Sequence, residues 1–177
     1  CVEAEDAAHS LLHRQVAVAS GVTADWAGAR SAVEQVLRGA GIDASGQVLD
    51  DGSGLSRTDR VTPRFLADVL RYARVLKPAA FTSMFEPDAL PVAGRTGTLI
   101  TGFGRYVTKH ASCARGLVQA KTGSLFDTTS LSGIAHTVSG GERIFSVLVN
   151  NRPQRYSALS TRQAIDGLTA TMTGCWD

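Results

Sequence analysis

Residues 117–150 read LVQAKTGSLFDTTSLSGIAHTVSGGERIFSVLVN. The opening residues of this stretch alternate in character with the two-residue period of a β-strand. Two later runs, 131–138 and 143–150, are rich in strand-forming residues and flank a turn that contains Gly140-Gly141. A Gly-Gly pair between two such runs is a strong signal for a hairpin. Residues 116–150 are therefore predicted to form three antiparallel strands.

Helical patterns surround these strands. Asp25 is the predicted N-cap of a helix, because the apolar residues after it recur at three- and four-residue steps. Thr62-Pro63 predicts the start of a second helix, since proline loses no hydrogen bond at the first helical position. Similar patterns predict helices over residues 7–19 and 157–172. Helices, a strand meander and a final helix indicate an α+β fold, in which an antiparallel sheet is covered by helices.

Composition excludes several classes of protein. The chain has 177 residues, 44% of them hydrophobic, and a formal net charge of +2, so we expect about one globular domain. The weak charge and the absence of a short Lys- or Arg-rich window argue against nucleic acid and against a polybasic membrane anchor. No apolar run approaches the roughly 18–20 residues that span a bilayer. Four aromatic residues fall at positions typical of a core and not of a base-stacking platform, namely Trp26, Phe65, Tyr72 and Phe145.

The three cysteines, Cys1, Cys113 and Cys175, lack the C-x-x-C spacing of a zinc knuckle or a thioredoxin-like pair. In an exported protein, Cys175 could pair with either Cys113 or Cys1, and the sequence does not choose between them. The chain starts at Cys1 without an initiator Met or a signal-peptide pattern. We interpret it as a processed or partial chain.

Two glycine-containing segments lie between the predicted helices and strands. Residues 50–56 read DDGSGLS and predict a tight turn, because Gly and Asp adopt turn conformations at little cost. Residues 78–116 carry repeated Gly and Pro with little periodicity. A segment of that length usually lines a site.

The tripeptide Lys121-Thr122-Gly123 stands at the end of the first predicted strand, with Ser124 next. Taken alone, it is most simply a surface strand end with a turn glycine. These residues nevertheless suit acyl transfer. The ammonium offers positive charge beside a serine nucleophile, the threonine hydroxyl can bind a substrate carboxylate, and glycine lets a peptide lie along the strand. The N–H of Ser124 can supply one donor of an oxyanion hole.

Three motifs occur in order along the chain: Asp51-Gly52-Ser53-Gly54-Leu55-Ser56-Arg57, Leu90-Pro91-Val92-Ala93-Gly94-Arg95-Thr96-Gly97-Thr98-Leu99, and Lys121-Thr122-Gly123-Ser124-Leu125. With them, the sequence from about residue 7 to the end resembles the D-alanyl-D-alanine carboxypeptidase/endopeptidase family, the low-molecular-mass class C penicillin-binding proteins. The resemblance implies the C-terminal part of a penicillin-binding-protein/serine β-lactamase-like transpeptidase domain. Residues 1–177 would then be the C-terminal portion of a single D,D-peptidase domain.

The same resemblance implies a function. It indicates a serine peptidase that cleaves the terminal D-Ala-D-Ala bond, or a cross-link, of peptidoglycan peptides and is acylated by β-lactams. Catalysis would use Lys121 and Ser124, and substrate binding would use Thr122 and Gly123, without a metal or an organic cofactor. The implied location is the periplasm or the cell surface.

Two further family motifs, Ser-x-x-Lys and Ser-x-Asn, supply the nucleophile and its base. No serine in this chain has Lys three residues later or Asn two residues later. We interpret both motifs as part of an N-terminal segment of the same enzyme; a gap in the chain or a second polypeptide would give the same pattern. The isolated chain is then expected not to hydrolyse substrate. The alternative hypothesis is a non-catalytic relative that binds muropeptide or a cell-wall partner.

Other residue sets could carry chemistry. Ser53 and Asp51 with His136 or His110 could make a Ser-His-Asp set, but the Gly-x-Ser-x-Gly elbow is not met. His9 and His13 have a spacing that can hold a metal on a helix, but without the Glu of His-Glu-x-x-His we interpret them as an exposed helix face. Arg95-Thr96-Gly97-Thr98 imitates Lys-Thr-Gly. We interpret it as a turn, with a second anion contact as the alternative.

Overall fold

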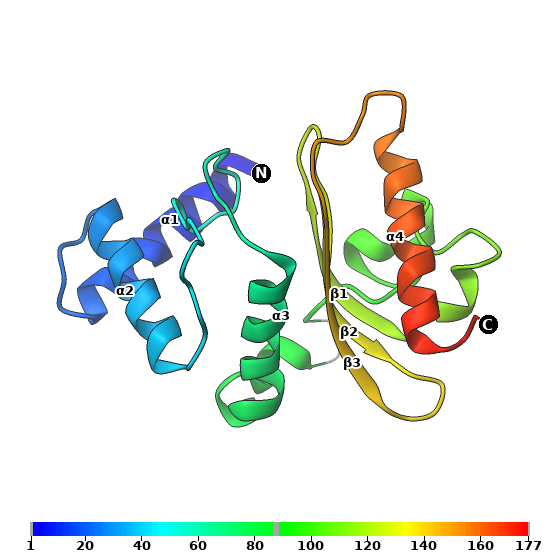
Figure 1. Cartoon of the computed structure of the whole chain (residues 1–177), viewed down its shortest axis with the longest axis horizontal. Helices are drawn as coiled ribbons and strands as arrows, with labels where there is room; N and C mark the ends of the chain where they lie inside the picture. The colour runs from blue at the N-terminus through cyan, green and yellow to red at the C-terminus, as the bar shows by residue number, and fades with distance from the viewer. Residues whose placement is uncertain (1, 87–88, 177) are drawn as a thin grey trace. The chain divides into compact units, whose positions relative to one another are not determined.

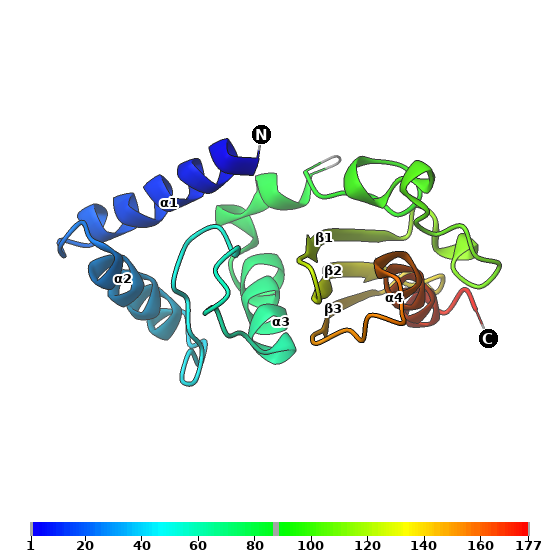
Figure 2. The same cartoon turned by 90° about the horizontal axis from the view of Figure 1, so that it is seen from above.

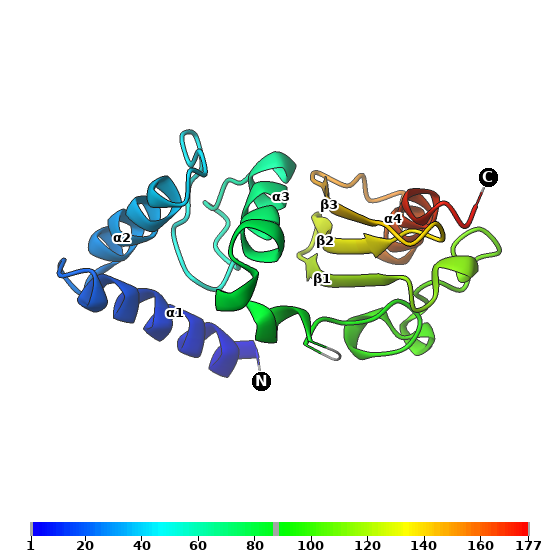
Figure 3. The same ribbon diagram turned by 90° about the horizontal axis from the view of Figure 1, so that it is seen from below.

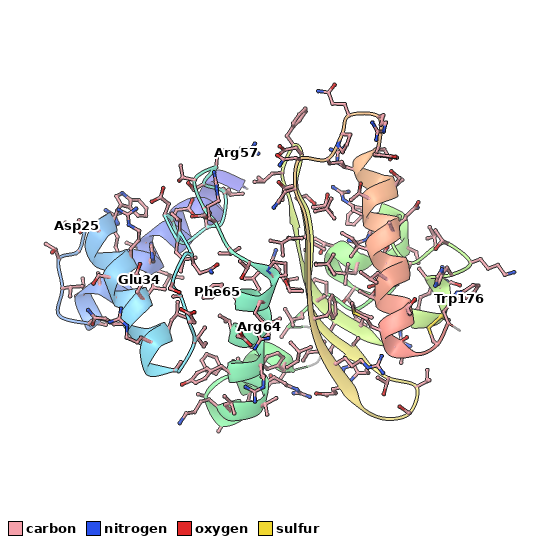
Figure 4. The ribbon with its side chains drawn as sticks, viewed as in Figure 1. Asp25, Glu34, Arg57, Arg64, Phe65 and Trp176 are labelled. Carbon is pink, nitrogen blue, oxygen red and sulfur yellow. A yellow bond between two sulfur atoms is a disulfide. The ribbon has the colours of Figure 1, made fainter. Side chains whose placement is uncertain are left out.

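The structure, a computed structural model, describes residues 2–86 and 89–176. The chain divides into two compact units, Cys1–Phe65 and Leu66–Asp177. In the first unit, α1 (Val2–Ala19) packs against α2 (Trp26–Gly39) (Figure 1). The side chain of Asp25 accepts a hydrogen bond of 2.7 Å from the N–H of Gly28. Figure 4 shows Asp25 at the start of α2, which confirms the predicted N-cap.

A tight loop after α2 is organised by Asp51. Its Oδ1 accepts hydrogen bonds from the N–H groups of Ser53 and Gly54, at 3.1 and 2.8 Å. Its Oδ2 accepts from the hydroxyl of Ser53 and the N–H of Ser56, both at 3.0 Å. Burial alone would raise the pKa of Asp51, but the hydrogen bonds outweigh it and lower the pKa. The predicted turn is confirmed, with a carboxylate at its centre.

The boundary between the units falls within α3 (Pro63–Arg71). The Oγ1 of Thr62 accepts from the N–H of Phe65 at 3.1 Å, which confirms the predicted start of this helix. One π-helical turn and several 3-10 turns follow: η1 (Tyr72–Leu76), η2 (Pro78–Ala80), η3 (Thr82–Phe85), η4 (Gly97–Leu99), η5 (Thr101–Phe103) and η6 (Ser112–Ala114). The long segment before the strands thus consists of short turns.

The second unit is built on a three-stranded antiparallel sheet in the order β1-β2-β3. The strands are β1 (Val118–Ser124), β2 (Thr129–His136) and β3 (Glu142–Val149). Lys121 lies opposite Ser132 in the β1–β2 register. Figures 2 and 3 show β1 at one edge of the sheet. The predicted meander is confirmed.

Helix α4 (Ala158–Thr173) packs on one face of this sheet (Figure 1). The hydroxyl of its N-cap, Ser157, accepts from the N–H of Ser160 at 2.9 Å. The side chains of Val118 and Ala120 from β1 are buried in one cluster with Ile165 and Ala170 from α4. This arrangement is the predicted α+β fold.

A buried ion pair fixes α4 to the segment before the strands. Arg105 and Asp166 side chains are 4% and 0% exposed, and the guanidinium contacts both carboxylate oxygens, the shortest contact being 2.6 Å. Asp166 also accepts from the N–H of Tyr106 at 2.9 Å. The phenol of Tyr106 shares a hydrogen bond of 2.9 Å with Thr169, and burial raises its pKa.

Cys113 and Cys175 form a disulfide, which is one of the pairings that the sequence left open. It ties η6 to the residues that follow α4. Beside it, the ring of Trp176 stacks on His110 with centroids 4.2 Å apart, beyond the end of the helix in Figure 4.

The core prediction for the aromatic residues is correct for Phe65 and Phe145, which are buried, and wrong for Trp26, which is 43% exposed. Trp26 is the first residue of α2, and its ring lies at the surface beneath the guanidinium of Arg14, 5.7 Å away. Tyr106, which the sequence did not single out, is fully buried. Among the helices that the structure describes, none has the length and apolar character needed to cross a bilayer.

Candidate active site

The outer edge of β1 has two halves, residues 118–120 and residues 121–124, which differ in their backbone pairing. Over the first half, the segment before the strands adds a short antiparallel bridge between Val92 and Gln119. The N–H of Ala93 donates to the carbonyl of Val118 at 2.8 Å, and the N–H of Ala120 donates to Pro91 at 2.9 Å. The backbone groups of Val118 and Ala120 therefore point away from β2.

Backbone direction in a strand repeats every second residue, so the N–H and C=O groups of Thr122 and Ser124 also point toward the outer edge. Among residues 2–86 and 89–176, no bridge is found along this second half. Residues Lys121 to Ser124 thus present an edge on which an extended peptide can add as a further strand.

Lys121 is exposed on this half of the strand. Its Nζ donates a hydrogen bond of 2.8 Å to the carbonyl oxygen of Thr122, which is one of the edge groups. The ammonium therefore lies at the edge itself. Side chains alternate between the faces of a strand, so Lys121 leaves the face opposite to Thr122 and Ser124.

Thr122 makes a contact that the Lys-Thr-Gly motif does not include. Its hydroxyl donates to the Oγ1 of Thr98 at 3.0 Å. Thr98 is exposed and belongs to η4. A tight turn places η4 beside Thr122. In this turn the N–H of Gly94 donates to the carbonyl of Leu99 at 2.8 Å, and Gly97 adopts a φ of +54°. The segment Arg95-Thr96-Gly97-Thr98 is a turn, as predicted, and it also brings a second hydroxyl to the edge.

Gly123 has a local reason to lack a side chain. A Cβ at this position would lie 2.3 Å from the Oγ of Ser130, its partner on β2. A larger residue would force that hydroxyl to turn away, and its side chain would stand beside Lys121 on the same stretch of strand. The backbone of the edge is accessible to a peptide partly because Gly123 adds no bulk.

Ser124 ends β1 and contributes two groups. Its N–H points to the outer edge by the alternation described above, and its Oγ accepts a contact of 3.4 Å from Nη2 of Arg162 on α4. Arg162 was not predicted from the sequence. It lies 38 residues from Ser124, and only the packing of α4 against the sheet brings the two together.

The β1–β2 turn beside Ser124 is held by a second arginine. Nη2 of Arg152 donates to the carbonyl of Phe126 at 2.6 Å, and its Nη1 donates to the carbonyl of Tyr156 at 2.5 Å. Arg155 lies over the ring of Tyr156, 4.9 Å from its centroid. Arg152 is thus committed to backbone carbonyls, and Arg155 to an aromatic ring.

The contacts of Ser53, His110 and His136 give no support to the Ser-His-Asp set that the sequence suggested. The hydroxyl of Ser53 donates to Asp51 within the tight loop. His110 stacks on Trp176, and His136 lies 3.5 Å from Glu142.

The structure gives no support to a metal site at His9 and His13. The side chain of His13 is buried, so the exposed-face interpretation is wrong for it, whereas the side chain of His9 lies outside the described residues. The described residues contain no group of three or more His, Cys, Asp or Glu side chains that could hold a metal ion.

The guanidinium of Arg95, the cation of the Arg95-Thr96-Gly97-Thr98 segment, packs against Gly116, where an added Cβ would lie 2.5 Å from it.

The sequence is similar to a known family over nearly its whole length. The model of the D-Ala-D-Ala carboxypeptidase 3 (S13) family matches residues 5–172. Carboxypeptidase DacB of Mycolicibacterium smegmatis is 37% identical over 174 residues, which are 98% of this chain and 36% of that protein. The D-alanyl-D-alanine carboxypeptidase of Actinomadura sp. is 36% identical over 140 residues, which are 79% of this chain and 25% of that protein.

A solved structure shares the fold. The crystal structure of penicillin binding protein 4 (dacB) from Haemophilus influenzae, complexed with a novel beta-lactam, superposes with a TM-score of 0.75 and 26% identity. The match covers 94% of this chain and 37% of that one. The chain therefore spans about a third of the length of several proteins that it matches.

Proposed function

Because this chain belongs to the D-Ala-D-Ala carboxypeptidase 3 (S13) family, we propose that it supplies the Lys-Thr-Gly side of the active site of a serine D,D-peptidase. The substrate would be a peptidoglycan peptide that ends in D-Ala-D-Ala. The observation that carries this proposal is the second half of the edge of β1, where Lys121, Thr122 and Ser124 face a position that an extended peptide can occupy.

The proposed reaction runs through an acyl-enzyme. A serine hydroxyl attacks the carbonyl carbon of the penultimate D-Ala, and its proton passes to the departing amine. The C–N bond breaks and D-Ala leaves. Water then attacks the resulting ester, which releases the shortened peptide and restores the serine. The serine and its base belong to a Ser-x-x-Lys motif, which this chain does not contain, so they would come from another part of the enzyme.

Each residue of the edge has a proposed role in that reaction. The Nζ of Lys121 provides positive charge and a proton-relay link to the serine of the Ser-x-Asn motif. The hydroxyl of Thr122 binds the terminal carboxylate, and the missing side chain of Gly123 lets the peptide lie along β1. The N–H of Ser124 donates to the oxyanion of the tetrahedral intermediate, a type of contact whose loss typically costs a factor of about 100–1000 in turnover.

The setting of the protein follows from the same proposal. Peptidoglycan lies outside the cytoplasmic membrane, so the protein would work in the periplasm or at the cell wall. The disulfide between Cys113 and Cys175 supports an oxidising compartment. A β-lactam would react with the same serine, with its carboxylate in the place of the terminal carboxylate of the peptide.

The test uses the polypeptide that contains this chain together with the Ser-x-x-Lys segment. It is incubated with a fluorescent penicillin and, separately, with an acylated peptide that ends in D-Ala-D-Ala. We expect a covalent label that survives boiling in detergent, together with release of free D-Ala. Binding of muropeptide without label and without D-Ala release would reject the enzyme in favour of the non-catalytic alternative.

A further inference from the structure

We propose that Arg162 is the residue that gives the site its preference for a substrate with a free terminal carboxylate. This inference rests on the proposed function, and it adds a cation that no motif of the sequence contains. Arg162 would contact the carboxylate from the α4 side, together with the hydroxyl of Ser124 and beside that of Thr122.

The geometry brings these groups to one face of β1. Val118 and Ala120 point their side chains into the core that α4 covers, so Thr122 and Ser124, which continue the same two-residue period, project on the same face. Arg162 reaches that face from α4, and its Nη2 lies 3.4 Å from the Oγ of Ser124. In Figure 1, the β1–β2 turn and the start of α4 lie at the same end of the sheet.

Arg162 is available for an anion. Among the described residues, its contact with Ser124 is the interaction found for its guanidinium, and no carboxylate forms an ion pair with it. The other arginines at this end are engaged differently: Arg152 holds two backbone carbonyls of the turn region, and Arg155 lies over Tyr156. Arg162 is half-buried, so its charge is less screened than that of a fully exposed arginine.

The hydrogen-bond directions also suit a carboxylate. Ser124 accepts from Arg162, so its own O–H is left to donate to one carboxylate oxygen. A guanidinium has five N–H donors in a planar fork, and further donors of Arg162 can reach the second oxygen. Only one nitrogen and one Cα separate the scissile carbonyl from the terminal carboxylate of the substrate. A carboxylate beside the Oγ of Ser124 therefore places that carbonyl close to the outward N–H of the same residue.

The test compares Arg162→Gln and Arg162→Lys in the complete enzyme, on two peptides that differ only in a free or an amidated terminal carboxylate. We expect Arg162→Gln to lower kcat/KM for the free acid by about tenfold, the loss typical of one charge-assisted hydrogen bond. The same variant should leave kcat/KM for the amide within about twofold. Arg162→Lys should recover most of the loss, because it restores the charge. Arg155→Gln is the matched control and should change neither substrate.

Equal losses for the acid and the amide would overturn the assignment and give Arg162 a structural role only. The assignment also fails if Arg162→Lys recovers nothing, or if Arg155→Gln has the same effect as Arg162→Gln. A wild-type enzyme that neither releases D-Ala nor takes up penicillin would instead reject the proposed function, and this inference with it.

Discussion

The hydroxyl of Thr122 donates a hydrogen bond of 3.0 Å to the Oγ1 of Thr98, across 24 residues of sequence. This contact joins the end of β1 to the turn that contains η4. A hydroxyl has a single proton to donate, so Thr122 must turn its proton from Thr98 to bind the carboxylate, and Thr98 can then donate its own proton to Thr122 or to the ligand. The proposed carboxylate site therefore contains a pair of threonines, of which only one lies in the Lys-Thr-Gly motif.

Replacement of Thr98 tests this pair. We expect Thr98→Val to slow acylation of the complete enzyme by penicillin about three- to tenfold, because Thr122 loses its partner and the site loses one donor. Thr98→Ser keeps the hydroxyl and should stay near the wild-type rate. The second-order rate constant of acylation is the measurement. A wild-type rate for Thr98→Val would remove Thr98 from the site.

Gly133 of β2 lies too close to the backbone of β1 for any side chain to fit. A Cβ there would lie 2.1 Å from the carbonyl oxygen of Gln119 and 2.6 Å from the Cα of Ala120, both backbone atoms of β1. We expect Gly133→Ala to lower the free energy of unfolding by about 2–3 kcal/mol, measured by urea denaturation. Gly39→Ala is the control, because nothing lies within 4 Å of the added Cβ, and it should be neutral or slightly stabilising. A neutral Gly133→Ala would show that β1 and β2 are not in this register.

The buried ion pair gives a second stability prediction. Asp166→Asn leaves the charge of Arg105 buried without its partner, and we expect a loss of about 3–5 kcal/mol. Tyr106→Phe removes only the hydrogen bond to Thr169 and should cost about 1 kcal/mol. Both losses are read from denaturant midpoints. If the two variants lose the same amount, the pair is hydrated in solution.

The ion pair of Glu142 with Arg74 should make the free energy of unfolding depend on pH. The hydrogen bond from Arg74 holds its pKa below the ordinary 4.5, although partial burial opposes the shift. A carboxyl whose folded pKa is depressed contributes stability above its unfolded pKa and loses it as the pH falls through the folded pKa. Both side chains are partly exposed, so the contribution is at most about 1 kcal/mol. The difference in unfolding free energy between wild type and Glu142→Gln should be present at pH 7 and shrink below about pH 4. A difference that is unchanged at low pH would contradict the assignment.

Local patterns in the sequence were sufficient to predict the main helices and strands of the fold. Asp25 and Thr62 cap the helices that they were predicted to cap, because N-capping depends on residues only three positions apart. The family resemblance was sufficient to identify the family, which the match to the D-Ala-D-Ala carboxypeptidase 3 (S13) family confirms. Trp26 shows the limit of periodicity, since a residue at the end of a helix can satisfy the pattern and still lie at the surface.

The partners of the site were not predictable in the same way. Thr98 was considered as part of a turn, with a second anion contact by its segment as the alternative, and Arg162 lay within a predicted helix with no signal of its own. Both reach β1 through long-range packing, one through the turn at Gly97 and the other through α4. The choice of Cys113 as the partner of Cys175 has the same origin, because only the fold brings η6 to the end of α4.

The most direct test of the proposed active site is the acylation rate of Lys121→Ala in the complete enzyme, measured with a fluorescent penicillin. Lys121 is exposed at the edge, so we expect an unchanged melting temperature and a second-order acylation rate constant that is lower by about 100-fold or more. Lys109→Ala, which removes another exposed lysine, should acylate at the wild-type rate. A folded Lys121→Ala enzyme that acylates as fast as wild type would contradict the claim that this edge of β1 forms part of the active site.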